Sequence, residues 1–174
     1  MKILVEFFGH SGLGKSSLAY SIAGRLKLNN ISCELYVEEM KRVCLGLSDK
    51  TPKESREEDT NNIIRLSENY KVVVADTNPY SGYIFGDTCL EVAKDEASFR
   101  YSPFSKVIRV FLLPKVKFEI DSTGRRESCL NNDFMDRVER LSSMPNSIKV
   151  ELEGHAGEKE FEHLWRELLS ELEG

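Results

Sequence analysis

The feature that most restricts how this sequence can fold is a glycine-rich turn between an apolar run and an amphipathic segment. The turn, from Gly9 to Ser16, reads GHSGLGKS and fits the pattern G-x-x-x-x-G-K-[ST] at every fixed position. Residues 3–8 before it are apolar except for Glu6, and apolar residues recur at four-residue steps between positions 18 and 26 after it. A strand, this turn and a helix in that order predict a phosphate-binding loop, or P-loop.

The residue types in this loop suit a nucleoside triphosphate. Glycines let the backbone curl without Cβ clashes, so that its N–H groups and the N-terminus of the following helix can point at phosphate oxygens. Lys15 is expected to reach the β- and γ-phosphates, and Ser16 to offer a hydroxyl to Mg²⁺. The alternative is a strand-to-helix turn that binds nothing. The candidate nucleotide-binding residues are Gly9, His10, Ser11, Gly12, Leu13, Gly14, Lys15, Ser16 and Ser17.

Composition excludes several other classes of protein. With 174 residues and 40% hydrophobic residues, we expect one domain over 1–174. The net charge of −5 argues against a nucleic-acid-binding surface. The longest apolar runs fall well short of the roughly 20 residues of a membrane helix. The four cysteines form no CxxC pair and no signal peptide precedes the first run, so we expect reduced thiols and a cytoplasmic protein.

Hydrophobic patterning predicts an α/β fold, because apolar runs alternate with amphipathic segments. Five strands are expected, over 3–8, 33–37, 72–75, 107–113 and 148–152. Helices are expected over 15–28, 54–70 and a C-terminal segment whose apolar stripe runs from 161 to 172 and packs on the sheet or, alternatively, binds a partner. Two polar segments broken by Pro or Gly, 45–59 and 113–133, are expected to be irregular, with a candidate lid loop over 114–133.

Acidic residues follow two of the expected strands, at the sheet edge where α/β proteins bind ligands. Asp76 follows the run 72–75 and is the candidate carboxylate for Mg²⁺; alternatively it caps a helix or a turn. Glu38 and Glu39 follow the run 33–37, and one of them, with Glu38 preferred, can accept a proton from a substrate hydroxyl. Exposed glutamates at a helix start are the alternative.

Arginines supply the third ingredient of phosphoryl transfer, since cations stabilise the charge on the transferred group. Arg125 and Arg126 stand beside Gly124, a pivot for a loop that can close over a nucleotide. Arg137 lies in a helical stretch, where it can alternatively pair with a neighbouring aspartate at 133 or 136. A solvated charged loop is the other interpretation of this region.

These features together resemble the P-loop nucleoside and nucleotide kinases, and most closely the small phage and bacterial AAA-type group that includes nicotinamide riboside kinase domains. The likeness rests on the glycine-rich loop, the glutamate after the second strand, the segment DTNP and the pattern P…D…GRRES…F..R. It implies a three-layer P-loop NTPase fold, with a five-stranded parallel sheet of order 2-3-1-4-5 flanked by helices.

The same resemblance implies ATP and Mg²⁺ as cofactors and a small acceptor such as a nucleoside or a (deoxy)nucleotide. ATP would bind at Gly9–Ser16, Glu38 would stand near the acceptor, Asp76 near Mg²⁺, and Arg125, Arg126 and Arg137 in or beside the lid. The acceptor is left open, as is a homo-oligomer. Two aromatic residues at 83 and 85 can stack a base or belong to the core.

Two rival functions use the same loop. A regulatory ATPase or GTPase switch would place a D-x-x-G motif against the γ-phosphate, and DSTG at 121–124 has this form, but the chain contains no N-K-x-D guanine-reading tetrad. A polynucleotide 5′-kinase would use a local basic patch, for which Lys115, Lys117, Arg125 and Arg126 are candidates, against the acidic balance of the whole chain.

Overall fold

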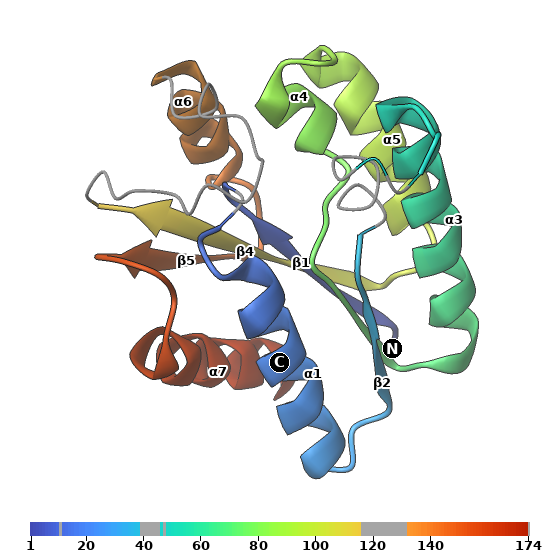
Figure 1. Ribbon diagram of the computed structural model, residues 1–174. Coiled ribbons are helices and arrows are strands. Elements are labelled where there is room, and N and C mark those ends of the chain that lie inside the picture. The colour runs from blue at the N-terminus through green and yellow to red at the C-terminus, as the bar shows by residue number, and fades with distance from the viewer. Residues whose placement is uncertain (11, 39–45, 47, 116–131, 174) are drawn as a thin grey trace.

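The computed structural model describes residues 1–10, 12–38, 46, 48–115 and 132–173. Its centre is a five-stranded sheet in which every paired strand is parallel to its neighbour, in the order β2-β3-β1-β4-β5 (Figure 1). The strands are β1 (Ile3–Phe8), β2 (Cys33–Tyr36), β3 (Val72–Ala75), β4 (Lys106–Pro114) and β5 (Ser147–Leu152). This order confirms the sheet expected from the sequence.

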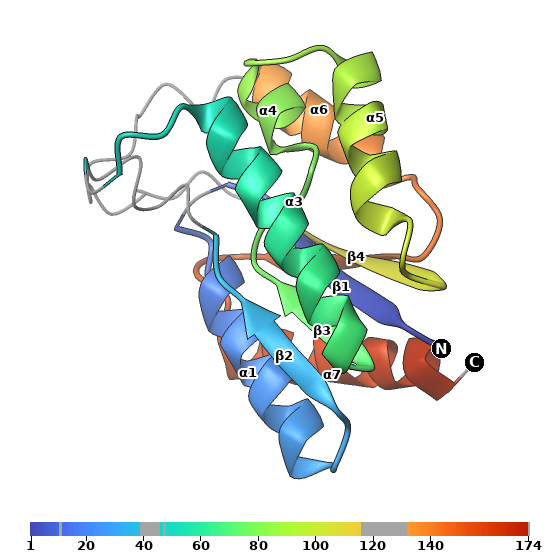
Figure 2. The same ribbon diagram turned by 90° about the vertical axis from the view of Figure 1, so that its right-hand side faces the viewer.

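Helices cover both faces of the sheet, as Figure 2 shows. They are α1 (Lys15–Leu28), α3 (Pro52–Asn69), α4 (Ser81–Phe85), α5 (Leu90–Tyr101), α6 (Asn132–Leu141) and α7 (Glu158–Glu173). Helices α1 and α7 pack on one face, where Leu164, Trp165 and Leu168 are buried, so the C-terminal apolar stripe packs on the sheet. The remaining helices form the opposite layer. No helix in the described part of the chain is long and apolar enough to cross a membrane.

Helix α3 confirms the helix expected over 54–70, and the overlapping expectation of an irregular segment over 45–59 is wrong from Pro52 onward, where α3 begins. Thr51 is the N-cap: its hydroxyl accepts a hydrogen bond from the Glu54 N–H (3.3 Å), and the Glu54 carboxylate accepts one from the Thr51 N–H (2.8 Å). Proline at the first position of a helix costs no internal hydrogen bond. Pro52 therefore starts a helix here. Residues 39–45 and 116–131, which include most of the candidate lid, lie outside the described residues.

A fully buried ion pair joins the P-loop strand to the layer of α3 and α5. Glu6 on β1 accepts hydrogen bonds from Arg100 (3.2 Å) and from the Tyr101 hydroxyl (2.7 Å), and the Arg100 Nε donates to Thr60 (3.0 Å). Burial raises the pKa of the Glu6 carboxyl, and the positive charge of Arg100 opposes that rise. Since β1 is buried along its whole length, its one charged side chain needs these partners. The network holds α3 and α5 in place beside the strand that leads into the P-loop.

Candidate functional site

The P-loop backbone has conformations and contacts that only glycine tolerates. Gly9, Gly12 and Gly14 have φ angles of 136°, 85° and 96°. A Cβ atom on Gly9 would lie 3.0 Å from the Leu112 carbonyl oxygen of β4, and one on Gly14 would lie 3.1 Å from the Ala156 Cβ. The glycines of the motif thus permit both the curl of the loop and its close packing against neighbouring chain.

The side chains of Lys15 and Ser16, the last two residues of the motif, reach groups in and beside the loop. Lys15 Nζ donates to the carbonyl oxygens of Gly9 (2.8 Å) and His10 (2.9 Å), at the start of the loop. Ser16 Oγ donates to Asp76 Oδ2 at 2.8 Å. Both side chains leave the first turn of α1, so the helix N-terminus and the lysine place positive charge at the same point.

Other residues of the motif face elsewhere. His10 and Leu13 are 2% exposed, and the ring centres of His10 and of Phe134 on α6 lie 5.3 Å apart in a T-shaped arrangement. Ser17 is exposed on α1, and Ser11 lies outside the described residues. The side chains of His10 and Leu13 therefore pack inside the protein and anchor the loop there.

The carboxylate of Asp76 connects three chain segments that are distant in sequence. It follows β3 and is 2% exposed, and its Oδ1 accepts the backbone N–H of Glu38 (2.8 Å) while Oδ2 accepts the Ser16 hydroxyl. Helix α4 begins after Tyr80 with no side-chain cap, so Asp76 is not its N-cap. The strand order places β3 between β1 and β2, which explains why the residue after β3 can reach both neighbours.

The oxygens of Ser16 and Asp76 suit a Mg²⁺ ion. Mg²⁺ prefers hard oxygen ligands and is commonly bound by one or two protein groups plus phosphate and water. Within the described residues, no group of three His, Cys, Asp or Glu side chains could hold a metal by itself. A hydroxyl and a carboxylate 2.8 Å apart beside a phosphate-binding loop match the donor set of a magnesium–nucleotide site.

Of the three candidate arginines, Arg137 is the only one among the described residues. It lies on α6 and reaches α4: Nη1 is 3.4 Å from the carbonyl oxygens of Tyr83 and Ile84, and the guanidinium lies 5.7 Å from the Tyr83 ring centre. Within the described part of α6 it forms no ion pair with Asp133 or Asp136. Arg137 thus ties α6 to α4.

The two aromatic residues of α4 have different environments. Tyr83 is partly buried against the core cluster between α4, α5 and α6, which favours a core role. Phe85 is 42% exposed, and its ring lies 5.4 Å from that of Phe134. Phe85 thus stays a candidate for contact with a ligand.

Sequence reasoning missed the turn that follows β5. The ring Nδ1 of His155 lies 2.6 Å from the Gly12 carbonyl oxygen, and the Ala156 N–H donates to the Leu13 carbonyl at 3.1 Å. This turn therefore belongs to the P-loop site. No local pattern signals it, because the contact joins positions 143 residues apart.

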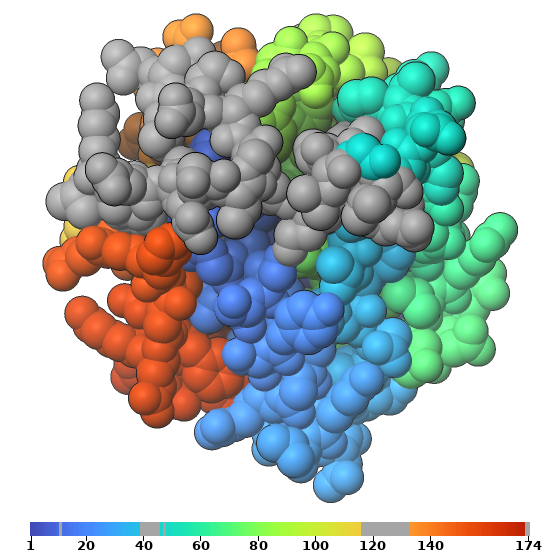
Figure 3. Space-filling model, viewed as in Figure 1, coloured from blue at the N-terminus to red at the C-terminus, as the bar shows by residue number. Residues whose placement is uncertain are grey.

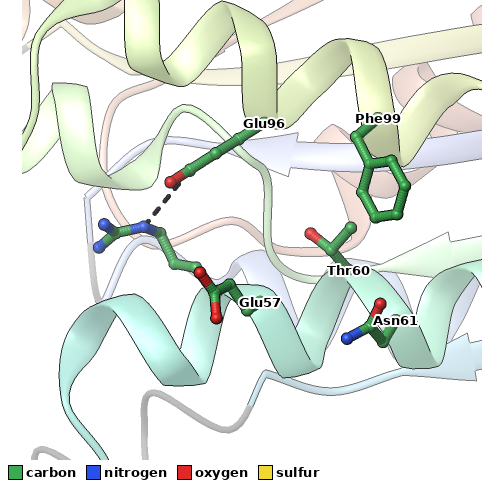
Figure 4. Close-up of a pocket in the computed structure, with 6 residues that line it drawn as sticks. Glu57, Thr60, Asn61, Glu96 and Phe99 are labelled. Atoms are coloured by element: carbon green, nitrogen blue, oxygen red, sulfur yellow. Dashed lines mark ion pairs between the residues drawn. The ribbon is translucent and has the colours of Figure 1, made fainter.

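A cavity of about 390 Å³ lies between α3 and α5, away from the P-loop residues. Figure 4 shows Glu96 of α5 reaching toward α3, where it pairs with the buried Arg56 at 3.4 Å. The other lining residues are Glu57, Thr60, Asn61 and Phe99. None of them is a candidate site residue, so this cavity is distinct from the site built on the P-loop.

With this geometry established, the chain can be compared with known proteins. A hexameric APS kinase from Thiobacillus denitrificans matches 98% of this chain with a TM-score of 0.57 and 16% identity, and the chain spans 29% of that protein's length. The APS kinase CysC of Mycobacterium tuberculosis matches with a TM-score of 0.54 and 16% identity, over 99% of this chain and 98% of that one. The fold is that of P-loop kinases. The sequence matches no family model and no curated protein.

Proposed function

We propose that the protein is an ATP-dependent phosphotransferase that moves the γ-phosphoryl group of ATP to a small acceptor, a nucleoside or a nucleotide. The observation that carries the proposal is the 2.8 Å contact between Ser16 and Asp76 beside the glycine loop. A P-loop alone identifies a triphosphate site. The buried carboxylate adds the second half of a magnesium–nucleotide site, on a fold shared with kinases.

The chain's residues divide the work of transfer. The backbone of the P-loop binds phosphate oxygens, Lys15 neutralises the β- and γ-phosphates, and Ser16 and Asp76 would hold Mg²⁺, which supplies further charge neutralisation when bound. Glu38 accepts the proton of the acceptor hydroxyl as the new P–O bond forms. At the same time the bond breaks between the γ-phosphorus and the oxygen that bridges the β- and γ-phosphates, and ADP leaves. Its backbone N–H already meets Asp76, so it stands at this edge of the sheet.

Arginines complete the proposed site. Arg125 and Arg126 stabilise the transferred phosphoryl group from the candidate lid, and Arg137, which contacts α4, acts in or beside that lid. A homo-oligomer is also part of the proposal, supported by the hexameric state named for one structural neighbour.

The test is acceptor-dependent formation of ADP. The panel contains nucleosides, deoxynucleoside monophosphates, nicotinamide riboside and, because of the structural neighbours, APS. We expect at least one acceptor to raise ADP formation well above the rate in water. If none does while ATP is bound and slowly hydrolysed, the regulatory switch is the better description; activation by a 5′-hydroxyl oligonucleotide alone would instead indicate a polynucleotide kinase.

Variants check that the activity belongs to this site. Lys15→Ala should abolish transfer, and the exposed Lys53→Ala on α3 is a matched loss of one positive charge that should leave it intact. Full activity in Lys15→Ala would remove the P-loop from the mechanism. Arg125→Ala and Arg126→Ala should lower kcat more than they raise the KM of the acceptor, and unchanged turnover in both would place them on the surface.

A further inference from the structure

The turn after β5 packs against the P-loop at three consecutive residues, Gly12, Leu13 and Gly14. His155 bonds to the Gly12 carbonyl, the Ala156 N–H bonds to the Leu13 carbonyl, and the Ala156 Cβ lies 3.1 Å from where a Cβ on Gly14 would stand. Two residues of the turn thus lie against Gly12, Leu13 and Gly14 of the P-loop.

These contacts orient the groups that bind phosphate. A peptide unit is planar, with its C=O and N–H on opposite sides, so fixing the carbonyl fixes the direction of the N–H. The Gly12 carbonyl shares its peptide plane with the Leu13 N–H, and the Leu13 carbonyl shares its plane with the Gly14 N–H. Hydrogen bonds from His155 and Ala156 to the two carbonyls therefore direct both N–H groups away from the turn.

The turn itself is held firmly enough to serve as a support. The Gly157 N–H donates to the Glu160 carboxylate at 2.9 Å, and the Phe161 N–H donates to the Gly157 carbonyl at 3.0 Å, so the turn runs directly into the first turn of α7. Helix α7 packs beside α1 in the shared core, and Figure 3 shows the surfaces of these two segments side by side. The P-loop is thus braced by the helix that follows the last strand.

The chemistry of the His155 ring suits this role. Because the Gly12 oxygen is a carbonyl acceptor, Nδ1 must carry the hydrogen in this contact, and Nδ1–H is a donor in that neutral tautomer as well as in the charged imidazole. The side chain of Asn carries an N–H donor at nearly the same distance from its Cα. Asn can therefore replace the bond, whereas Ala cannot.

We propose that His155 and the Ala156 N–H are positioning groups of the nucleotide site, which preset the Leu13 and Gly14 amides for phosphate before a nucleotide arrives. The identity of the nucleotide rests on the proposed function, whereas the presetting of the loop does not. Neither group needs to touch the ligand.

The test compares His155→Ala, His155→Asn and the exposed control Glu153→Ala from the same turn, all in the full chain. Hydrogen–deuterium exchange of the P-loop amides, measured without ligand, reads the presetting directly, and calorimetry reads ATP affinity. Loss of one hydrogen bond should speed exchange of these amides and weaken ATP binding by about three- to tenfold in His155→Ala. His155→Asn and Glu153→Ala should stay within about twofold of wild type, with the KM of the acceptor unchanged in all three.

Two results would overturn the inference: P-loop exchange in His155→Ala equal to that of wild type, or His155→Asn as impaired as His155→Ala. Thermal unfolding of each variant separates local loosening from general loss of the fold, and His155→Ser, which shortens the side chain, should repeat the effect of Ala. If the wild-type protein bound no ATP, the proposed function would fail, yet the exchange comparison would still decide the role of His155.

Discussion

Replacing Gly14 by alanine tests the close packing of the P-loop against the turn after β5. Gly14 is the N-cap of α1 and has φ 96° and ψ 16°. An L-residue in a left-handed conformation costs about 1–2 kcal/mol, and crowding a packed site costs about 1–3 kcal/mol. The new Cβ would lie 3.1 Å from the Ala156 Cβ and 3.4 Å from its backbone nitrogen. We expect a total cost of about 2–5 kcal/mol for the loop conformation seen in the structure.

This free-energy cost should appear partly as lower stability of the folded protein and partly as weaker ATP binding. If the loop relaxes in the free protein, the free energy of unfolding falls little and ATP binding weakens, because binding must restore the strained conformation. If the loop stays in place, stability falls instead. The sum of the loss in unfolding free energy, from urea titration, and the loss in ATP binding free energy, from calorimetry, should therefore be about 2–5 kcal/mol.

A second glycine in the same segment provides the control. Gly24 lies inside α1, and a Cβ there would meet nothing within 4 Å, so Gly24→Ala should stabilise the protein by about 0.5–1 kcal/mol and leave ATP binding unchanged. Adding Ala156→Gly to Gly14→Ala should recover only the part of the free-energy loss that comes from crowding against the Ala156 side chain. A summed loss below about 1 kcal/mol in Gly14→Ala would refute the argument that only glycine fits here.

Three further variants probe other parts of the structure. Asp76→Asn removes the charge but keeps the size, and should raise the Mg²⁺ concentration needed for ADP formation by about 10–100-fold; unchanged Mg²⁺ dependence would separate Asp76 from the metal. Arg100→Met leaves the buried Glu6 without its cation and should lower the free energy of unfolding by about 3–5 kcal/mol at pH 7. Because burial raises the pKa of Glu6, the folded state favours the protonated carboxyl. The loss of unfolding free energy in Arg100→Met should therefore be small below the ordinary pKa of 4.5 and grow as the pH rises through the raised pKa. Urea titrations at several pH values measure this dependence. Thr51→Ala should cost about 1 kcal/mol by removing the N-cap of α3, while Thr51→Ser should cost little in the same titration.

Local sequence patterns predicted most of the sheet. The expected strands over 3–8 and 72–75 and the helix over 15–28 have the same bounds in the structure, because a fully buried strand and a P-loop helix each carry a strong signal within a few residues. Pro52 was taken as part of an irregular segment because proline breaks the interior of a helix. Proline also suits the first position of a helix, and the capping box at Thr51 shows that Pro52 has this second role. No element was expected over 81–101, where α4 and α5 form.

In the candidate site, too, some features were predicted from the sequence and others depended on the tertiary structure. Sequence predicted that Ser16 and Asp76 serve one ion, and the strand order brings their oxygens to 2.8 Å. The role of Arg137 depended on its neighbours: the sequence offered nearby aspartates, whereas the structure places its guanidinium against α4. Side-chain direction on a helix follows from what packs there, and α4 was not foreseen.

By itself the sequence determined the P-loop turn, the strands beside it and the residue types that the proposed phosphoryl transfer requires, because each of these depends on neighbours within about ten positions. Only the tertiary structure decided what surrounds the turn: that Leu112 and Ala156 leave no room for a Cβ, and that His155 fixes the Gly12 carbonyl. Those contacts join residues about 100 or more positions apart, and they arise from the order in which parallel strands assemble, which no local pattern encodes.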